Sequence, residues 1–208
     1  GLYQHQAGIG RMTFDDHLPG YRGTLSRNAV TIAEVLKESG YATSMVGKWH
    51  IAETPLRKDQ REWLAHHVYH ETYSDLCHYP VNRGFDTHYG TIYGVVDYFD
   101  PFSLVEGEVP VKEVPDGYYI TQALSDRAVK EVKEYAKDDK PFFMYLAYTA
   151  PHWPLHALPE DIEKYKDTYK VGWEAIRNAR YERQKQLGIF PNMDNFLSDR
   201  QFKDKWED

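Results

Sequence analysis

The stretch GYATSMVGKWHIA, residues 40–52, places two basic side chains directly after a short apolar run. Its run YATSMV, residues 41–46, is made of β-branched and apolar residues, which is the composition of a buried strand. Lys48 and His50 then follow the predicted end of that strand. Because they are two residues apart beyond the strand, both side chains can be directed at the same ligand.

The residues before this strand predict a helix whose two ends are both marked. Thr31 and Glu34 have the spacing of a capping box, and Gly40 suits the left-handed position that follows a helix. Between them, one helix face is expected to be apolar and to carry Ile32, Val35 and Leu36. The order is therefore helix, tight turn, buried strand.

A second unit of the same kind occurs later in the chain. Residues 119–137 have apolar side chains at every fourth position, which predicts an amphipathic helix of about four turns. The following run KPFFMYLAY, residues 140–148, is almost wholly apolar, the pattern of a strand covered on both faces. It leads into TAPHWPLHALP, so His152 also lies just beyond a predicted strand end.

Two helix-then-strand units predict an α/β fold with helices flanking a sheet. In open sheets of this kind, ligands bind outside the carboxyl ends of the strands, where Lys48, His50 and His152 would converge. Residues 53–117 are aromatic and poorly periodic, and we interpret them as a long irregular insertion with short structure of its own. Two helices are expected after Pro159, and residues 189–208 are expected to be weakly structured.

Composition limits the classes of partner. The 208 residues have a formal net charge of −7 with basic residues scattered among acidic ones, so no nucleic-acid partner is expected. No apolar run is long enough for a membrane span, and no signal peptide is visible. The single cysteine, Cys77, excludes an internal disulfide, and we expect no metal ligand within residues 1–208.

Four ordered segments carry a family resemblance: GLYQHQAGIGRM, GYATSMVGKWH, RGFDTHYG and PFFMYLAYTAPHWPLHA. They resemble segments of the sulfatases, the formylglycine-dependent sulfuric ester hydrolases of the alkaline-phosphatase-like superfamily, and above all the bacterial arylsulfatases. The resemblance implies a partial alkaline-phosphatase-like sandwich over residues 1–208. It also implies hydrolysis of a small-molecule or glycan sulfate ester by a periplasmic or secreted parent protein.

The resemblance also implies roles for three residues. Lys48 is similar to the family lysine that binds the sulfate, and a fixed cation suits an ester whose charge must be held during attack. His50 is similar to the histidine that hydrogen-bonds the formylglycine hydroxyls. His152 is similar to the histidine that contacts the sulfate or protonates the leaving oxygen, a task for a group that titrates near neutral pH.

The chain also departs from the family pattern. The family nucleophile comes from a Cys/Ser-x-Pro-x-Arg motif, which Cys77 in CHYP does not match. Asp15-Asp16 and Asp194-Asn195 imitate the calcium-binding pairs of the family, but neither follows an apolar strand. We therefore expect an internal fragment, inactive alone, with formylglycine and the calcium ligands of the complete enzyme outside these residues.

Two other functions remain open from the sequence. A phosphonate or phosphate monoester hydrolase of the same superfamily would have similar charge demands. A noncatalytic module that binds sulfated glycans would explain the aromatic segment and the missing nucleophile. Four side chains either line the substrate pocket or only pack against their neighbours: His5, Trp49, Tyr93 and Tyr98.

Overall fold

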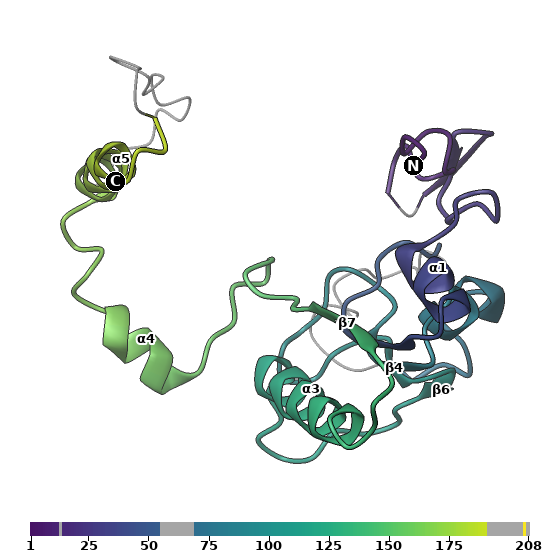
Figure 1. Ribbon diagram of the computed structural model, residues 1–208. Coiled ribbons are helices and arrows are strands. Elements are labelled where there is room, and N and C mark those ends of the chain that lie inside the picture. Colours follow the sequence, from purple (N-terminus) through teal and green to yellow (C-terminus); the bar gives the residue numbers. More distant parts are fainter. Residues whose placement is uncertain (13, 55–68, 191–205, 207–208) are drawn as a thin grey trace. The chain divides into compact units, whose positions relative to one another are not determined.

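The computed structural model describes residues 1–12, 14–54, 69–190 and 206. The chain divides into two compact units, residues 1–156 and 157–208 (Figure 1). All residues singled out in the sequence as candidates for the site belong to the first unit. Within the described ranges, none of the helices combines the length and the hydropathy of a membrane span.

A mixed five-stranded sheet forms the centre of the first unit, in the order β6-β5-β4-β3-β7. The middle strand β3 (Ala42–Gly47) runs parallel to both β4 (Thr87–Thr91) and β7 (Phe142–Ala147). β5 (Leu104–Glu106) is antiparallel to β4, and β6 (Val109–Pro110) is antiparallel to β5. The predicted α/β class is confirmed, and β3 and β7 lie side by side (Figure 1).

Helix α1 (Ile32–Glu38) begins as predicted. Thr31 and Glu34 form both hydrogen bonds of the capping box, and Gly40 has a φ of 90°. The expected apolar face, however, is not the buried one: Ile32 is 62% exposed, whereas Ala33 is fully buried. The small side chain of Ala33 lets the helix backbone approach the loop that contains Gly84. A Cβ added to Gly84 would lie 2.2 Å from the backbone nitrogen of Glu34.

Helix α3 (Ile120–Tyr135) buries the first part of the predicted face through Ile120, Leu124 and Ala128, whereas Val132 further along is 39% exposed. It contacts β3, β4 and β7. Its Glu131 carboxylate accepts a hydrogen bond from the Ser44 hydroxyl of β3. Because side chains alternate along a strand, Thr43 faces the other side of the sheet, where its hydroxyl donates to Gly84 O at 2.7 Å. β3 is thus anchored on both faces.

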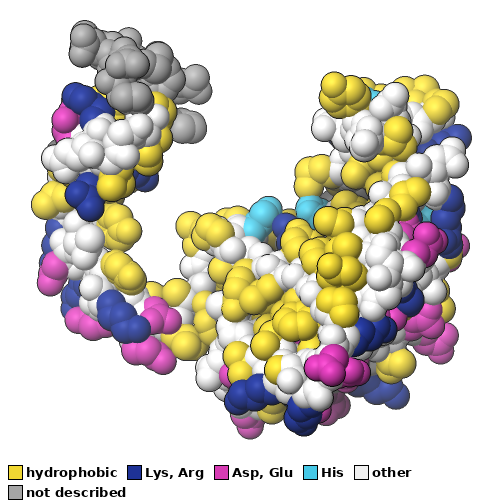
Figure 2. Space-filling model, in the orientation of Figure 1, with side chains coloured by type: hydrophobic (Ala, Val, Ile, Leu, Met, Phe, Trp, Pro, Cys, Tyr) yellow, Lys and Arg dark blue, Asp and Glu magenta, His cyan; other side chains and the backbone are white. Residues whose placement is uncertain are grey.

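Strand β7 differs from its prediction. It was expected to be covered on both faces, but it is the edge strand of the described sheet. Phe142, Tyr145 and Leu146 are each more than a third exposed. Figure 2 shows hydrophobic side chains gathered on the surface where Figure 1 places β7. An apolar run predicts burial only where neighbouring elements cover it.

Residues 53–117, interpreted as an insertion, supply β4, β5 and β6 to the same sheet as β3. The short helices η1 (Leu76–His78) and η2 (Pro80–Asn82) precede β4. Part of this segment, residues 55–68, lies outside the described residues. The strands have no apolar run of their own, since β4 reads THYGT, and their pairing with β3 is what places them in the sheet.

Arg83 ties the loop before β4 to the N-terminal segment. Its side chain is fully buried and donates to Leu25 O at 2.8 Å and to Ala29 O at 2.7 Å. It also forms an ion pair with Glu34 at 3.0 Å. The guanidinium therefore joins residues 25–29 and α1, because it satisfies carbonyl groups that would otherwise be buried unpaired.

The remaining elements lie at the N-terminus and in the second unit. The N-terminal hairpin consists of β1 (Asp15–Leu18) and β2 (Tyr21–Arg22). In the second unit, α4 (Pro159–Tyr165) and α5 (Trp173–Gln186) confirm the two helices expected after Pro159. Of the segment 189–208, only residues 189, 190 and 206 are described.

Candidate active site

Lys48 lies immediately past β3, where the strand contacts β7. Its backbone N–H donates to Ala147 O at 2.8 Å, so the pairing of the two strands extends to this residue. The side chain is half-buried, and burial lowers the pKa of its ammonium group. Among the described residues, no carboxylate forms an ion pair with Lys48. A partly desolvated cation without a counter-ion favours binding of an anion.

His50 is fixed on several sides. Its N–H donates to Ile92 O at 3.1 Å, and its backbone has a φ of 59°. The ring packs edge-on against Tyr93, with 5.9 Å between the ring centroids. Gly94 faces the ring so closely that an added Cβ would lie 2.2 Å from it. Gly94 therefore provides the space that the imidazole occupies.

The electrostatics of His50 link it to the other two candidates. Burial, together with the neighbouring charges of Lys48 and His152, lowers the pKa of His50 to about 4. His50 is therefore neutral near pH 7. Since only nearby charges have this effect, Lys48 and His152 both lie close to His50 in the structure. They lie beyond the carboxyl ends of β3 and β7.

His152 lies on the exposed loop that follows β7. Its N–H donates to Thr149 O at 3.0 Å, and ring atom Nδ1 is 2.6 Å from the carbonyl oxygen of Trp153. Because a carbonyl only accepts, Nδ1 carries the proton and Nε2 is left as the basic nitrogen. The Tyr98 hydroxyl donates to His152 O at 2.7 Å. This hydrogen bond thus ties the His152 loop to the segment 97–102.

Three residues of the site were not singled out from the sequence for these roles. Gly94 makes room for His50, and Tyr98 supports the His152 loop from a buried position. His88 of β4 is buried, and its Nε2 lies 3.2 Å from the carbonyl oxygen of Gly47, the residue that precedes Lys48. RGFDTHYG was quoted only as a segment of family resemblance, and no local pattern predicted the contact of His88 with β3.

The aromatic candidates divide between packing and support. Trp49 is buried, and its indole N–H donates to His78 O at 2.8 Å, so it packs beneath the site. Tyr93 contacts the His50 ring. His5 packs edge-on against Tyr21 in the N-terminal segment, with 5.2 Å between the ring centroids.

The described residues do not fit the calcium ion that the resemblance implies. Asp16 is ion-paired with Arg11 at 3.1 Å, and Asp15 lies 3.7 Å from Arg22, so both carboxylates have basic partners. Asp194-Asn195 lies outside the described residues. In the ranges that the structure describes, no three carboxylates gather in a cluster of the kind that calcium prefers.

Comparisons with known proteins show the family of the chain. The sequence model of the Sulfatase family matches residues 1–200. An arylsulfatase of Klebsiella aerogenes is 30% identical over 212 residues, which cover 100% of this chain and 42% of that protein. An uncharacterized sulfatase of Schizosaccharomyces pombe is 29% identical, covering 92% of this chain and 35% of that protein. The chain thus spans well under half the length of these relatives.

Solved structures share the fold. The crystal structure of Ps i-CgsB has a TM-score of 0.54 at 31% identity and covers 71% of this chain and 32% of that chain. Its complex with k-i-k-neocarrahexaose has a TM-score of 0.52, also at 31% identity, and covers 68% and 31%. The family match over residues 1–200, the shared fold and the ordered site segments lead to one conclusion: this chain belongs to the sulfatase family.

Proposed function

We propose that this chain forms the sulfate-binding side of an enzyme that hydrolyses sulfate esters, with a formylglycine nucleophile supplied from outside residues 1–208. The observation that supports this most is the convergence of Lys48, His50 and His152 past two adjacent parallel strands. A cation without a carboxylate partner among the described residues stands beside two imidazoles. Such a set suits an anionic ester.

Each side chain has a distinct task in this proposal. The Lys48 ammonium group offsets the negative charge on the sulfate oxygens and stabilises the charge that moves during the attack on sulfur. His50 is neutral at pH 7, so its imidazole can donate a hydrogen bond without adding a second fixed cation. His152 has its free Nε2 on an exposed loop and, when protonated, gives a proton to the leaving oxygen.

Formylglycine, once present, supplies the nucleophile. Cys77 does not fit this role: it lies in η1, outside the Cys/Ser-x-Pro-x-Arg pattern. The substrate is proposed to be a small-molecule or glycan sulfate ester, because a relative of the same fold was solved with the oligosaccharide k-i-k-neocarrahexaose. The sulfatase match favours sulfate over phosphate.

Turnover of 4-nitrophenyl sulfate by the complete protein that carries this chain tests the proposal. Lys48→Ala should lower kcat by about 100- to 1000-fold, the loss that follows removal of one preorganised charge-stabilising group. The matched control is Lys140→Ala, which removes the same charge from an exposed loop before β7 and should leave turnover unchanged.

Two results would refute the proposal. One is near-wild-type turnover in Lys48→Ala; the other is faster cleavage of 4-nitrophenyl phosphate than of the sulfate by the unmodified protein. Residues 1–208 alone should show no turnover even with calcium and a formylglycine-generating enzyme, because groups that act as a unit fail together.

A further inference from the structure

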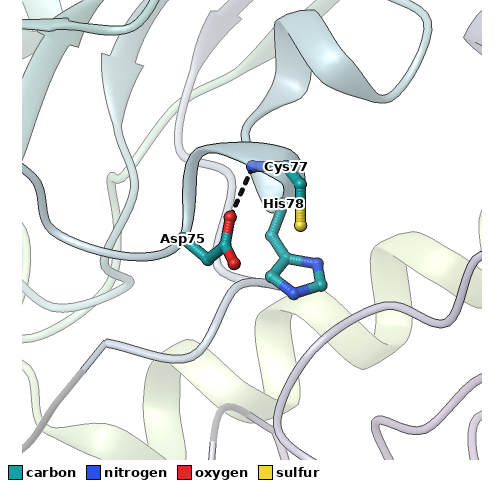
Figure 3. A group of neighbouring side chains, drawn as sticks. All are labelled: Asp75, Cys77 and His78. Carbon is teal, nitrogen blue, oxygen red and sulfur yellow. Dashed lines mark hydrogen bonds between the residues drawn. The ribbon is translucent and has the colours of Figure 1, made fainter.

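A second group of chemically reactive side chains lies in the turn that leads into η1. Asp75, Cys77 and His78 place a carboxylate oxygen, a thiol sulfur and an imidazole nitrogen within 4.8 Å of one another. Figure 3 shows the three side chains on the same side of the turn, with the sulfur beside the imidazole ring. This is the one such group of three potential ligands among the described residues.

The backbone of this turn is held from its other side. Asp75 accepts a hydrogen bond from the Cys77 N–H at 2.9 Å through one carboxylate oxygen, Oδ1, and its carboxylate also interacts with the Cys77 side chain (Figure 3). Arg27 donates to Cys77 O at 3.2 Å, and the Trp49 indole donates to His78 O at 2.8 Å. The three side chains are therefore presented by a fixed backbone, which lowers the entropy cost of gathering them around an ion.

His78 has an unused nitrogen in this position. Its Nδ1 is buried and makes no hydrogen bond to the described part of the chain. Buried polar atoms are almost always paired, so an unpaired ring nitrogen beside a thiol and a carboxylate requires an explanation. A metal ion bonded to Nδ1 would supply the missing partner.

The surroundings of His78 carry charges of both signs, because Asp75 and Glu53 act on it as anions and Arg27 and Arg83 as cations. A pocket of about 590 Å³ opens beside Asp75 and His78 and is also lined by the carboxylates of Asp15 and Glu53. The pocket gives an ion a path from solvent. Arg22, which also lines the pocket, lies 3.7 Å from Asp15, so its charge is partly offset.

We propose that Asp75, Cys77 and His78 bind a zinc ion, with water in the fourth position. Zinc takes a thiolate, an imidazole and a carboxylate together in a tetrahedron, whereas calcium and magnesium prefer oxygen ligands alone. Binding displaces the thiol proton into solvent, so the thiolate is the ligand. The ion would fix the turn whose carbonyl holds Trp49, between Lys48 and His50 of the sulfate site.

Cobalt(II) is the probe that tests this most specifically. Cobalt bound to thiolate gives a near-ultraviolet charge-transfer band, and Cys77 is the only thiol in the 208 residues. The unmodified chain should show this band at a stoichiometry of one ion per chain, and one equivalent of zinc should abolish it. Cys77→Ser should remove the band.

His78→Gln and Asp75→Asn should weaken zinc affinity, measured by competition with a chromophoric chelator, by about 10- to 100-fold each. Asp75→Asn retains a side-chain oxygen for the Cys77 N–H, so its effect reports the lost charge rather than the lost cap. His17→Gln, on the exposed β1 hairpin, is the matched histidine control and should change nothing. Zinc should also slow alkylation of Cys77.

The proposal is overturned by any of three results in chains whose circular dichroism shows the native fold. These are absence of the cobalt–thiolate band, a stoichiometry of one ion per two chains, or zinc affinity that is equal in the unmodified chain and in His78→Gln.

Discussion

Strands β3 and β7 are parallel neighbours in the sheet, yet they occupy different environments, and the strand with the larger apolar side chains is the more exposed one. Met45 of β3 and Tyr145 of β7 are register partners, but Met45 is fully buried and Tyr145 is 48% exposed. β3 has β4 and β7 on its two sides and contacts α1 and α3, while β7 is at the edge of the described sheet. The burial of a strand therefore depends more on the elements packed around it than on its own residues.

The same contrast extends to the loops that carry the site. Past β3, the backbone N–H groups of Lys48 and His50 bond to β7 and to the segment after β4, and the His50 ring is packed by Tyr93 and Gly94. Past β7, His152 is exposed and is held through Tyr98 and Trp153. The buried strand thus fixes its groups tightly, and the edge strand presents its histidine to solvent.

The largest effect is expected from Gly47→Ala at the end of β3. Gly47 has a φ of 124°, and an added Cβ would lie 1.9 Å from Ala147 O. Because backbone rather than a flexible side chain is in the way, β3 and β7 would have to separate. We expect a loss of at least about 4 kcal/mol in the free energy of unfolding, measured by urea denaturation. A loss below 1 kcal/mol would show that the strands are not so closely paired.

A smaller loss of stability is expected from truncating the register partners Met45 and Tyr145, and the two losses should differ. Met45→Ala should cost about 2–5 kcal/mol because it leaves a cavity in the core. Tyr145→Ala removes a larger side chain but should cost less than about 1 kcal/mol, since half of that side chain already contacts solvent. Equal losses in the two variants would mean that β7 is covered in solution.

Acidification should weaken the β3 side of the sheet through His88. Burial lowers the pKa of His88 to about 4 from 6.5. The unfolded chain therefore takes up this proton more readily than the folded chain between these values. The contribution of neutral His88 to the free energy of unfolding is fully present above pH 6.5. It is lost as the pH drops toward 4, and the loss is on the order of 3 kcal/mol.

Denaturation curves at several pH values check this, with His88→Gln as the variant that lacks the titrating ring. Its stability should depend less steeply on pH between 6.5 and 4. His17→Gln, on the exposed hairpin, should keep the full slope. If His88→Gln kept the slope as well, the ring would not be buried and neutral.

Local signals predicted those parts of the fold that depend on a few neighbouring residues. The capping box of Thr31 and Glu34 and the left-handed Gly40 were readable because they act within one helix. The buried face of α1 was not, because it depends on how closely the helix approaches Gly84. β4 was not predicted for a similar reason: only the contacts with β3 explain why His88 and Gly90 occupy their positions.

The site was predictable to the same degree. Lys48, His50 and His152 could be named because each follows a strand within a recognisable segment. Gly94 and Tyr98 could not, because they act on His50 and His152 from a different part of the chain. Asp75, Cys77 and His78 were overlooked because their spacing matches no common metal motif, and only the turn at η1 brings their ligand atoms together.

In our proposal the ends of β3 and β7 form a single anion site, and the titration of His50 tests this most directly. The Cε1 proton of this ring can be followed by NMR against pH in histidine-labelled protein. The account predicts a pKa of about 4 for His50. It should rise in Lys48→Met and in His152→Gln, because each removes a positive neighbour, and again when sulfate is added; Lys140→Met should not change it. A His50 pKa near 6.5 that responds to neither His152→Gln nor sulfate would contradict the account.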